Sequence, residues 1–201
     1  MRIGIFGGTF DPPHIGHLIL ADEAQVQLDL EKVWWVLTPI PPHKLDLETT
    51  PTTDRLDMVK AALVDQDRFE VSYVDINRSP PYYALDTMRI LKDQNPFHRF
   101  IYLVGGDSLA DFPTWHQPVE FIQICDEIGV MCRPGFRVDL DQLGEEIPGL
   151  VDKVRIIHAP LLEISSSQIR IRIQKGLPFR YYLPEGVYYI ILERGLYSLT
   201  N

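Results

Sequence analysis

Cysteine is scarce in this sequence, and the two cysteines that occur do not indicate a disulfide framework or a metal site. Cys125 and Cys132 lie in a stretch whose pattern predicts a helix over 118–125 and a strand over 127–132. Their spacing relative to the histidines matches no zinc motif. We therefore expect two buried thiols of the kind that stay reduced in the cytosol.

Excess positive charge is also lacking. The 201 residues include 19 Lys and Arg against 28 Asp and Glu, a formal net charge of −9. A general nucleic-acid binder or a polybasic membrane anchor needs clustered lysine and arginine facing phosphates. No apolar run approaches the roughly 18 residues of a membrane-spanning helix, and residues 2–6 resemble a strand rather than a signal peptide. These absences predict a cytoplasmic protein with no nucleic-acid or membrane partner.

What the sequence does contain is an alternation of short apolar runs with longer helical stretches. The runs are apolar almost throughout, which is typical of strands buried on both faces of a parallel sheet. We predict an α/β fold, a doubly wound, Rossmann-like, mostly parallel sheet with helices on both faces. The expected strands cover 2–6, 32–38, 69–74, 99–104, 127–132 and 153–158, and the expected helices cover 15–28, 53–65, 83–94, 165–175 and 185–194, with helical turns over 108–125.

The length fits one domain, because domains usually hold about 100–200 residues. We predict a single domain over 1–201, with about 165–197 as a C-terminal subregion, and surface loops over 39–52 and 134–152. The second loop carries an acidic run that we expect to be solvated. Apolar spacing predicts which helical residues face inward: Ile15, Leu18, Ile19, Ala21 and Val26 in one helix, and Leu56, Val59, Ala62 and Leu63 in another.

The first informative motif is GGTFDPPHIGH at 7–17, directly after the first strand and at the start of the first helix. Gly7 and Gly8 allow a tight turn and a close approach to a ligand. A helix start offers unpaired N–H groups that suit an anion. His14 and His17 are three residues apart, so they share one helical face and could hold phosphate oxygens. The rival interpretation, a two-histidine metal site, lacks an evident third ligand.

The second motif is ISSSQIR at 164–170, which follows the last predicted strand and opens a helix. Serines at a helix start present hydroxyls and free N–H groups together. Between Ser165 and Pro184 there are four basic residues and no acidic one, a local reversal of sign in an acidic chain. Such a patch suits a polyphosphate, and Arg170 suits bidentate contact with it. The plainer alternative is an ordinary capped helix with exposed arginines.

These two motifs resemble those of the bacterial nicotinate mononucleotide adenylyltransferases, within the superfamily of nucleotidyltransferases that share an H-x-G-H element. The family pattern G-G-x-F-D-P-x-H-x-G-H matches 7–17, and its I-S-S-T-x-I-R matches 164–170 with Ser167 in place of threonine. Class I aminoacyl-tRNA synthetases share the short element but are much longer. The resemblance extends over residues 3–197, except that 136–152 cannot be mapped.

The resemblance implies which residues bind ATP. His14 and His17 would hold the triphosphate, and the serines with Arg170 would hold the leaving phosphates. At the end of strand 99–104 a glycine would let adenosine approach, and Asp107 would accept hydrogen bonds from ribose hydroxyls or cap the next helix. The implied ATP-binding set is Gly7, Gly8, Thr9, Phe10, His14, His17, Gly105, Asp107, Ile164, Ser165, Ser166 and Arg170.

The resemblance also implies an acceptor site. Lys44, in the loop PIPPHK, would contact the phosphate of the mononucleotide or be an ordinary surface lysine. Trp115 resembles the residue that stacks on the pyridine ring, the alternative being a core tryptophan. Tyr83-Ala84 matches a Tyr-Thr pair that contacts the pyridine carboxylate, although Ala84 lacks the hydroxyl, and Arg133 also matches.

The implied reaction is ATP plus nicotinate mononucleotide giving deamido-NAD and pyrophosphate, with His14, His17, Lys44 and Arg170 as the catalytic residues. The substrate phosphate is itself the nucleophile, so positioning and charge stabilisation would carry catalysis. We expect Mg²⁺ to arrive with ATP and no metal ligands from the protein. Alternatives are nicotinamide mononucleotide or both mononucleotides as acceptor, a pantetheine-phosphate adenylyltransferase or glycerol-phosphate cytidylyltransferase, and a noncatalytic nucleotide sensor. A homo-oligomer is possible.

Overall fold

The computed structural model describes residues 1–40, 49–132, 139–160 and 162–198. Its six strands are all parallel and form one sheet in the order β3-β2-β1-β4-β5-β6. The doubly wound parallel sheet expected from the sequence is therefore confirmed. The strands are β1 (Arg2–Gly8), β2 (Lys32–Leu37), β3 (Phe69–Ser72), β4 (Arg99–Gly105), β5 (Glu127–Cys132) and β6 (Val154–His158).

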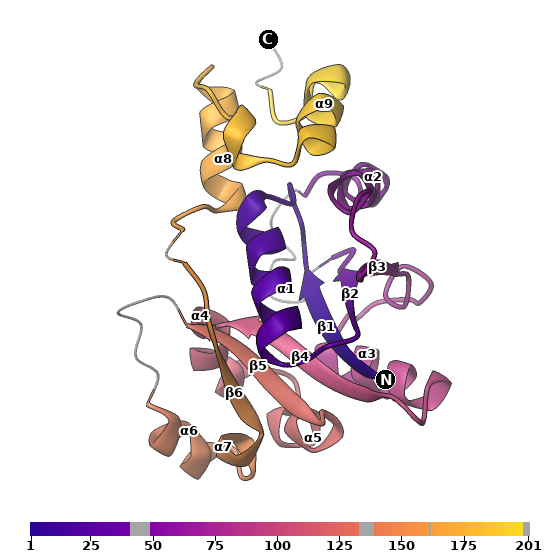
Figure 1. The fold of residues 1–201 in the computed structure, drawn as a ribbon, viewed down its shortest axis with the longest axis vertical. Helices are drawn as coiled ribbons and strands as arrows, with labels where there is room; N and C mark the ends of the chain where they lie inside the picture. The colour runs from indigo at the N-terminus through magenta and orange to yellow at the C-terminus, as the bar shows by residue number, and fades with distance from the viewer. Residues whose placement is uncertain (41–48, 133–138, 161, 199–201) are drawn as a thin grey trace.

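Helices cover both faces of this sheet (Figure 1). Within the described part of the chain, none of them is long and apolar enough to cross a membrane. The helices are α1 (Ile15–Gln27), α2 (Thr52–Ala62), α3 (Ala84–Gln94), α4 (Gly106–Ala110), α5 (Pro118–Ile124), α6 (Leu140–Glu146), α7 (Leu150–Lys153), α8 (Ser166–Gln174) and α9 (Glu185–Arg194), with short 3₁₀ helices η2 (Phe112–Thr114) and η3 (Arg180–Tyr182).

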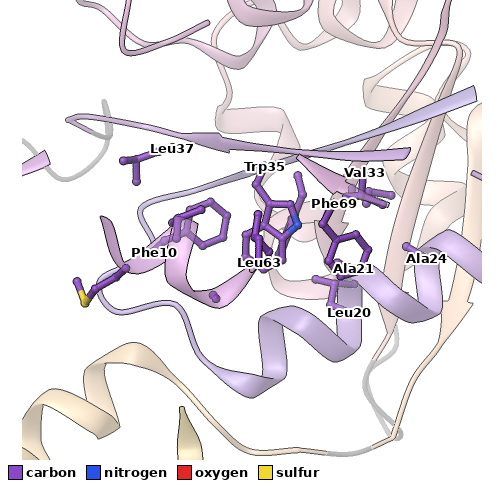
Figure 2. Close-up of a cluster of buried hydrophobic side chains, with 14 of the residues drawn as sticks. Phe10, Leu20, Ala21, Ala24, Val33, Trp35, Leu37, Leu63 and Phe69 are labelled. Carbon is purple, nitrogen blue, oxygen red and sulfur yellow. The ribbon is translucent and has the colours of Figure 1, made fainter. Parts of the chain in front are cut away.

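The two faces of the sheet carry two hydrophobic clusters. On one face, α1, α2, α8 and α9 contribute to a cluster that includes Trp35, which is fully buried, and Phe10 and Phe69 lie against its ring (Figure 2). On the other face, α3, α5, α6 and α7 pack around a second cluster that includes Phe100 and Phe121. Burial of such aromatic rings contributes much of the stability of a domain. Val187 and Ile191 of α9 belong to the first cluster and α9 contacts α2, so the C-terminal subregion shares the core on that face.

The inward face of α1 differs from the one that apolar spacing predicts. Leu20, Ala21 and Ala24 are buried, whereas Val26 is 67% exposed and the apolar residues of the first turn are only half-buried. The prediction for Val26 was wrong because α1 has apolar residues on more than one side, so their count does not identify the buried face. The small alanines let the helix lie close to the sheet.

The stretch 134–152, expected to be a loop, is in part helical. Asp139 caps α6 by accepting a hydrogen bond from the Gln142 N–H at 3.0 Å. Leu143, Ile147 and Leu150 are buried against the second cluster, while the acidic residues of this stretch are exposed as expected. The acidic composition suggested a loop because it masked a sparse apolar face. Residues 133–138 lie outside the described residues.

Cys125 agrees with the expected buried, reduced thiol. It is 1% exposed and free, and burial raises the pKa of its thiol. A thiol with a raised pKa carries little thiolate, so it is a poor nucleophile and a poor metal ligand. The side chain of Cys132 lies outside the described part of the structure.

Candidate functional site

The site lies where the sheet changes winding direction. From β1 the chain winds outward through β2 and β3, returns to β4 beside β1, and then winds toward the other edge. Open α/β sheets bind ligands outside the carboxyl ends of the strands at such a point. Gly8 ends β1 and Gly105 ends β4, so both predicted glycine turns are here. A methyl group on Gly105 would meet no described atom within 4 Å, which leaves room for a ligand.

The loop after β1 folds back over its own strand. Phe10 has a left-handed backbone with φ of 47°, and its ring is 2% exposed between Phe6 and Trp35. A methyl group on Gly8 would lie 2.8 Å from the Phe10 ring, and one on Gly7 would lie 2.8 Å from the Tyr102 hydroxyl. The glycines are thus required by the protein's own rings, and any contact of Phe10 with a nucleotide would involve its backbone.

His14 and His17 lie side by side at the start of α1. His14 is the residue that precedes the helix, and its backbone N–H donates to Nδ1 of His17 at 3.1 Å. The two rings stack with centroids 3.7 Å apart. Because Nδ1 of His17 accepts a hydrogen bond, the proton of the neutral ring lies on Nε2. The fold therefore gives His17 one donor, Nε2–H, in a fixed orientation.

His17 is kept neutral by its surroundings. Its pKa lies well below the ordinary value, first because burial removes water from the charged form and second because His14 is adjacent. The ring also lies against Phe10, with centroids 5.2 Å apart. A neutral imidazole can still donate a hydrogen bond to an anion, but it adds no full positive charge. The arrangement suits a preorganised donor.

The lowered pKa of His17 predicts how stability changes with pH. Below its ordinary pKa of about 6.5, the unfolded chain protonates His17 while the folded chain does not, so stability falls as pH falls toward the lowered value. Asparagine can accept the His14 N–H but does not titrate. We expect wild type to lose stability relative to His17→Asn between about pH 7 and about pH 5, measured by chemical denaturation. Parallel pH profiles would contradict the lowered pKa.

The second motif meets the first. The Ser166 hydroxyl donates to the Pro12 carbonyl at 2.8 Å, and an Nη of Arg170 donates to the Asp11 carbonyl at 2.6 Å. Ser165 caps α8 by accepting from the Gln168 N–H at 3.2 Å. Two stretches more than 150 residues apart are thus joined at one place, as a shared polyphosphate site requires.

Ile164 reaches the same place. A methyl group on Gly16 would lie 3.0 Å from Nδ1 of His14 and 3.9 Å from Cβ of Ile164. The missing side chain of Gly16 therefore lets the histidine ring and the start of the second motif approach each other.

Two other basic residues of the 165–184 run, Arg172 and Arg180, bond to partners outside the first motif. Arg172 donates to the Pro178 carbonyl at 2.7 Å, and Arg180 pairs with Glu185 at 3.1 Å. These two members of the cationic run predicted over 165–184 are therefore held by other partners. Arg170 is the member of that run that bonds to the first motif.

Two of the predicted acceptor residues, Ala84 and Trp115, pack against the second cluster, on the face of the sheet opposite α1. Tyr83 precedes α3 and Ala84 begins it, and the Tyr83 ring stacks on His116 with centroids 4.0 Å apart. Trp115, the neighbour of His116, is half-buried and packs on Phe112 at the edge of the second cluster. Trp115 is thus partly a core residue while keeping some exposed surface.

A small pocket lies between the start of α3 and the carboxyl end of β1. Its walls come from Gly7, Val36 and Thr38 at the carboxyl ends of β1 and β2, from Tyr102 in β4, and from Asp75, Tyr82, Ala84 and Thr87 near α3. A larger open hollow lies between β3 and α3, with Trp34 and Gln94 on its walls, and contains none of the predicted site residues.

Sequence reasoning missed Arg55, which lies under the site. Its side chain is 1% exposed although it carries a charge. Burial lowers the pKa of Arg55, and the charge of Asp11 opposes this. The guanidinium joins the loop after β1 to both ends of the loop between β2 and α2 by donating to the carbonyls of Thr9 at 2.8 Å, Thr38 at 3.0 Å, Pro39 at 2.6 Å and Thr50 at 2.7 Å.

Asp11 is a second missed residue. It is 6% exposed, and its carboxylate accepts hydrogen bonds from the Tyr197 hydroxyl at 2.7 Å and from the Thr50 N–H at 3.2 Å. Together with Arg170 on its carbonyl, Asp11 links the first motif to α8 and to the C-terminal segment. Burial and this carboxylate raise the pKa of Tyr197, which therefore stays a donor.

The sequence contained a signal for Arg55. It precedes Met58 by three residues, Val59 by four and Ala62 by seven, the spacing of one helical face, and all three are buried. An arginine in the middle of an apolar face is buried with partners or exposed at the edge of that face. Sequence alone does not distinguish these cases, because the partners are backbone carbonyls from other loops.

Three predicted site residues cannot be placed. Lys44 and Arg133 lie outside the described residues, as does the side chain of Asp107, whose backbone belongs to α4. Their roles stay predictions. In the described ranges, no group of three or more His, Cys, Asp or Glu residues is arranged to hold a metal ion.

Comparison with known proteins identifies the family to which this chain belongs. Residues 5–172 match the family model described as Cytidylyltransferase-like. A protein of Thermomicrobium roseum is 40% identical over 100% of this chain and 93% of its own length, and one of Exiguobacterium sibiricum is 40% identical over 98% of this chain and 100% of its own. Both are named "probable nicotinate-nucleotide adenylyltransferase".

Solved structures share the fold. The nicotinic acid mononucleotide adenylyltransferase of Plasmodium falciparum, complexed with NaAD, superposes with a TM-score of 0.81 over 98% of this chain and 97% of its own, at 21% identity. The same enzyme complexed with APC gives a TM-score of 0.78, with 98% and 96% of the two chains covered at 20% identity. The family match and the full-length relatives together establish that this chain belongs to the Cytidylyltransferase-like family and, within it, to the nicotinate-nucleotide adenylyltransferases.

Proposed function

We propose that this protein transfers AMP from ATP to nicotinate mononucleotide, giving deamido-NAD and pyrophosphate as a step of NAD synthesis. The observation that carries the proposal is the junction of the two motifs, where Ser166 and Arg170 bond to the loop that leads to His14. Relatives that are 40% identical along nearly the whole chain carry the corresponding name. We propose that it acts in the cytoplasm, as the sequence predicted.

In the proposed reaction, an oxygen of the mononucleotide phosphate attacks the α-phosphorus of ATP. A new P–O bond forms, the bond from the α-phosphorus to the bridging oxygen breaks, and pyrophosphate leaves with the electron pair. The nucleophile is already anionic, so the protein needs no covalent intermediate. Nε2–H of His17 and the adjacent His14 would meet the charge that develops on the α-phosphate, in the manner of an oxyanion hole.

The leaving phosphates would lie at the start of α8. The first N–H groups of a helix lack helical partners and favour anions. The hydroxyls of Ser165 and Ser166 already hydrogen-bond within the protein, so we propose that backbone N–H groups contribute more than the sequence suggested. Arg170 would add charge at the same place. We propose the remaining ATP-binding contacts, from Thr9, Ile164, Gly105 and Asp107, on the basis of the family resemblance.

Mg²⁺ would enter as part of the substrate, bound to ATP. Mg²⁺ keeps several waters and is commonly held by phosphates with one or two carboxylates. We propose that the ion is held mainly by phosphate and water. When bound, the ion would neutralise charge on the triphosphate.

At the acceptor side, we propose that Tyr83, Ala84 and Trp115 contact the pyridine ring, and that Lys44 and Arg133 contact the phosphate or the ring. Because Ala84 has no hydroxyl, backbone N–H groups at the start of α3 would recognise the acidic group. A homo-oligomer stays a prediction.

The test is pyrophosphate release from ATP with nicotinate mononucleotide, nicotinamide mononucleotide, 4′-phosphopantetheine and glycerol 3-phosphate in parallel. We expect release with nicotinate mononucleotide and a weaker response with its amide. Equal or preferred use of the amide would favour a dual-specificity or nicotinamide enzyme. Binding of ATP without release by any acceptor would indicate a nucleotide sensor and refute the proposal.

Arg170 provides a separate test of the ATP site. Lysine keeps the charge but loses the planar fork, so it cannot bond to the Asp11 carbonyl and to a phosphate at once. We expect Arg170→Lys to raise the KM for ATP by about tenfold, the change produced by losing one charge-assisted hydrogen bond. Arg172→Lys, in the same helix, is the matched control. Unchanged ATP kinetics for Arg170→Lys would exclude the bidentate role.

A further inference from the structure

A buried ion pair lies beneath the start of α3, outside the two motifs. Asp75 is 2% exposed and Thr87 is 3% exposed. The Asp75 carboxylate accepts hydrogen bonds at one oxygen from Nε of Arg78 at 2.9 Å and from the Thr87 hydroxyl at 2.7 Å. Burying a charge costs free energy unless the charge is paired and hydrogen-bonded. A buried ion pair outside the two motifs therefore suggests a specific role.

The rest of the Arg78 guanidinium holds the segment that leads into α3. It donates to the Pro81 carbonyl at 2.6 Å and to the Tyr83 carbonyl at 3.3 Å. It also lies 5.1 Å from the centre of the Tyr82 ring, a cation–π contact. Arg78 therefore fixes three consecutive residues, and Asp75 fixes Arg78.

These residues form one side of the small pocket beside β1. Asp75, Thr87, Tyr82 and Ala84 all line it, opposite Gly7 of the first motif. Since Ala84 offers no side-chain donor, recognition there depends on where the backbone N–H groups of the first helical turn point. That direction is set by the carbonyls that Arg78 holds.

We propose that Asp75 and Arg78 are positioning residues for the acceptor, which orient the 81–84 segment so that its backbone can bind the acidic group of a pyridine mononucleotide. The proposal rests on the proposed function. It predicts a split between the substrates, because the hydrogen bonds of Asp75, Arg78 and Thr87 stay within the 75–87 segment and, among the described residues, none reaches either ATP motif, even though Gly7 lines the same pocket.

The experiment compares Arg78→Lys and Asp75→Asn with wild type, and uses Arg89→Lys as the control. Arg89 lies in α3, the helix that follows the Arg78 network, but it is exposed, with partners Asp86 and Glu120 at the surface. For each protein, the KM of each substrate is measured, and binding of nicotinate mononucleotide alone and of ATP alone is measured by calorimetry.

Lysine cannot reach Asp75 and the two carbonyls together, so we expect Arg78→Lys to bind the mononucleotide about tenfold more weakly or worse, a loss matching one charge-assisted hydrogen bond. Its affinity for ATP is expected to stay within about twofold of wild type, as is every parameter of Arg89→Lys. Asp75→Asn keeps an acceptor for the Thr87 hydroxyl but loses the charge attraction to Arg78. We therefore expect this variant also to bind the mononucleotide more weakly than wild type, but by less than Arg78→Lys. If Arg78→Lys fails to fold, Asp75→Asn decides the question.

A folded variant with unchanged mononucleotide affinity would overturn the proposal. So would equal weakening of both ligands, since that indicates a general structural role. Failure of the proposed function has a different signature, because wild type itself would then release no pyrophosphate with nicotinate mononucleotide.

Discussion

Replacing His17 with alanine is expected to lower kcat by about 10²-fold or more, the cost of removing one preorganised donor from an anionic transition state. The structure fixes this donor twice, by the hydrogen bond from the His14 N–H to Nδ1 and by the stacked His14 ring. The donor is therefore oriented before the substrate arrives. The single-turnover rate with ATP and nicotinate mononucleotide measures the effect directly.

Two further variants separate chemistry from folding. His17→Asn places an acceptor oxygen where Nδ1 lies, so the start of α1 keeps its hydrogen bond while Nε2–H is lost. We expect this variant to melt close to wild type and still lose most of kcat. His98→Ala removes an imidazole just before β4, at the amino-terminal ends of the strands and away from the site. This variant should leave kcat unchanged. Near-normal turnover by a folded His17→Ala would remove His17 from the mechanism.

Replacing Arg55 with methionine is expected to lower the free energy of unfolding by about 3 kcal/mol or more, because buried carbonyls lose their donors and each unsatisfied group costs about 1–3 kcal/mol. Those carbonyls belong to the loops after β1 and β2 and to residue 50, so the same change should raise the KM for ATP. Methionine keeps the volume, which isolates the effect of the lost donors.

The stability of Arg55→Met is measured by urea denaturation alongside Arg68→Met, an exposed arginine just before β3. Surface substitutions of this kind usually change stability by no more than about 0.5 kcal/mol. Arg55→Lys should lie between the two, because one ammonium group cannot serve four diverging carbonyls. If Arg55→Met is as stable as Arg68→Met, the loops are held by other contacts.

The elements of the sheet were predictable because strands buried on both faces must be apolar almost throughout, as in β1 and β4. Helix faces were less predictable. Val26 continues an apolar pattern but is exposed, and Leu143, Ile147 and Leu150 are buried within an acidic stretch. Burial depends on which neighbour a helix meets, and this information lies in other segments of the chain.

The residues of the candidate site also divide into those that a motif predicts and those that it does not. His14, His17, Ser165, Ser166 and Arg170 could be selected from motifs because their chemistry is local: a helix start and a group that suits an anion. Arg55 and Arg78 could not, because their partners are backbone carbonyls, which every residue has. A sequence identifies side chains that can donate hydrogen bonds to anions. It does not identify which backbone carbonyls the fold leaves without a backbone donor.

The amino-acid sequence by itself determined the order of strands and helices and the kinds of side chain that end up at the carboxyl edge, because periodicity and helix-capping chemistry act over a few residues. The tertiary structure alone decided that Ser166 and Arg170 bond to Pro12 and Asp11, and that Arg172 and Arg180 bond to other partners. Contacts between residues so far apart in the chain depend on how whole layers pack against each other, and no local pattern encodes that geometry.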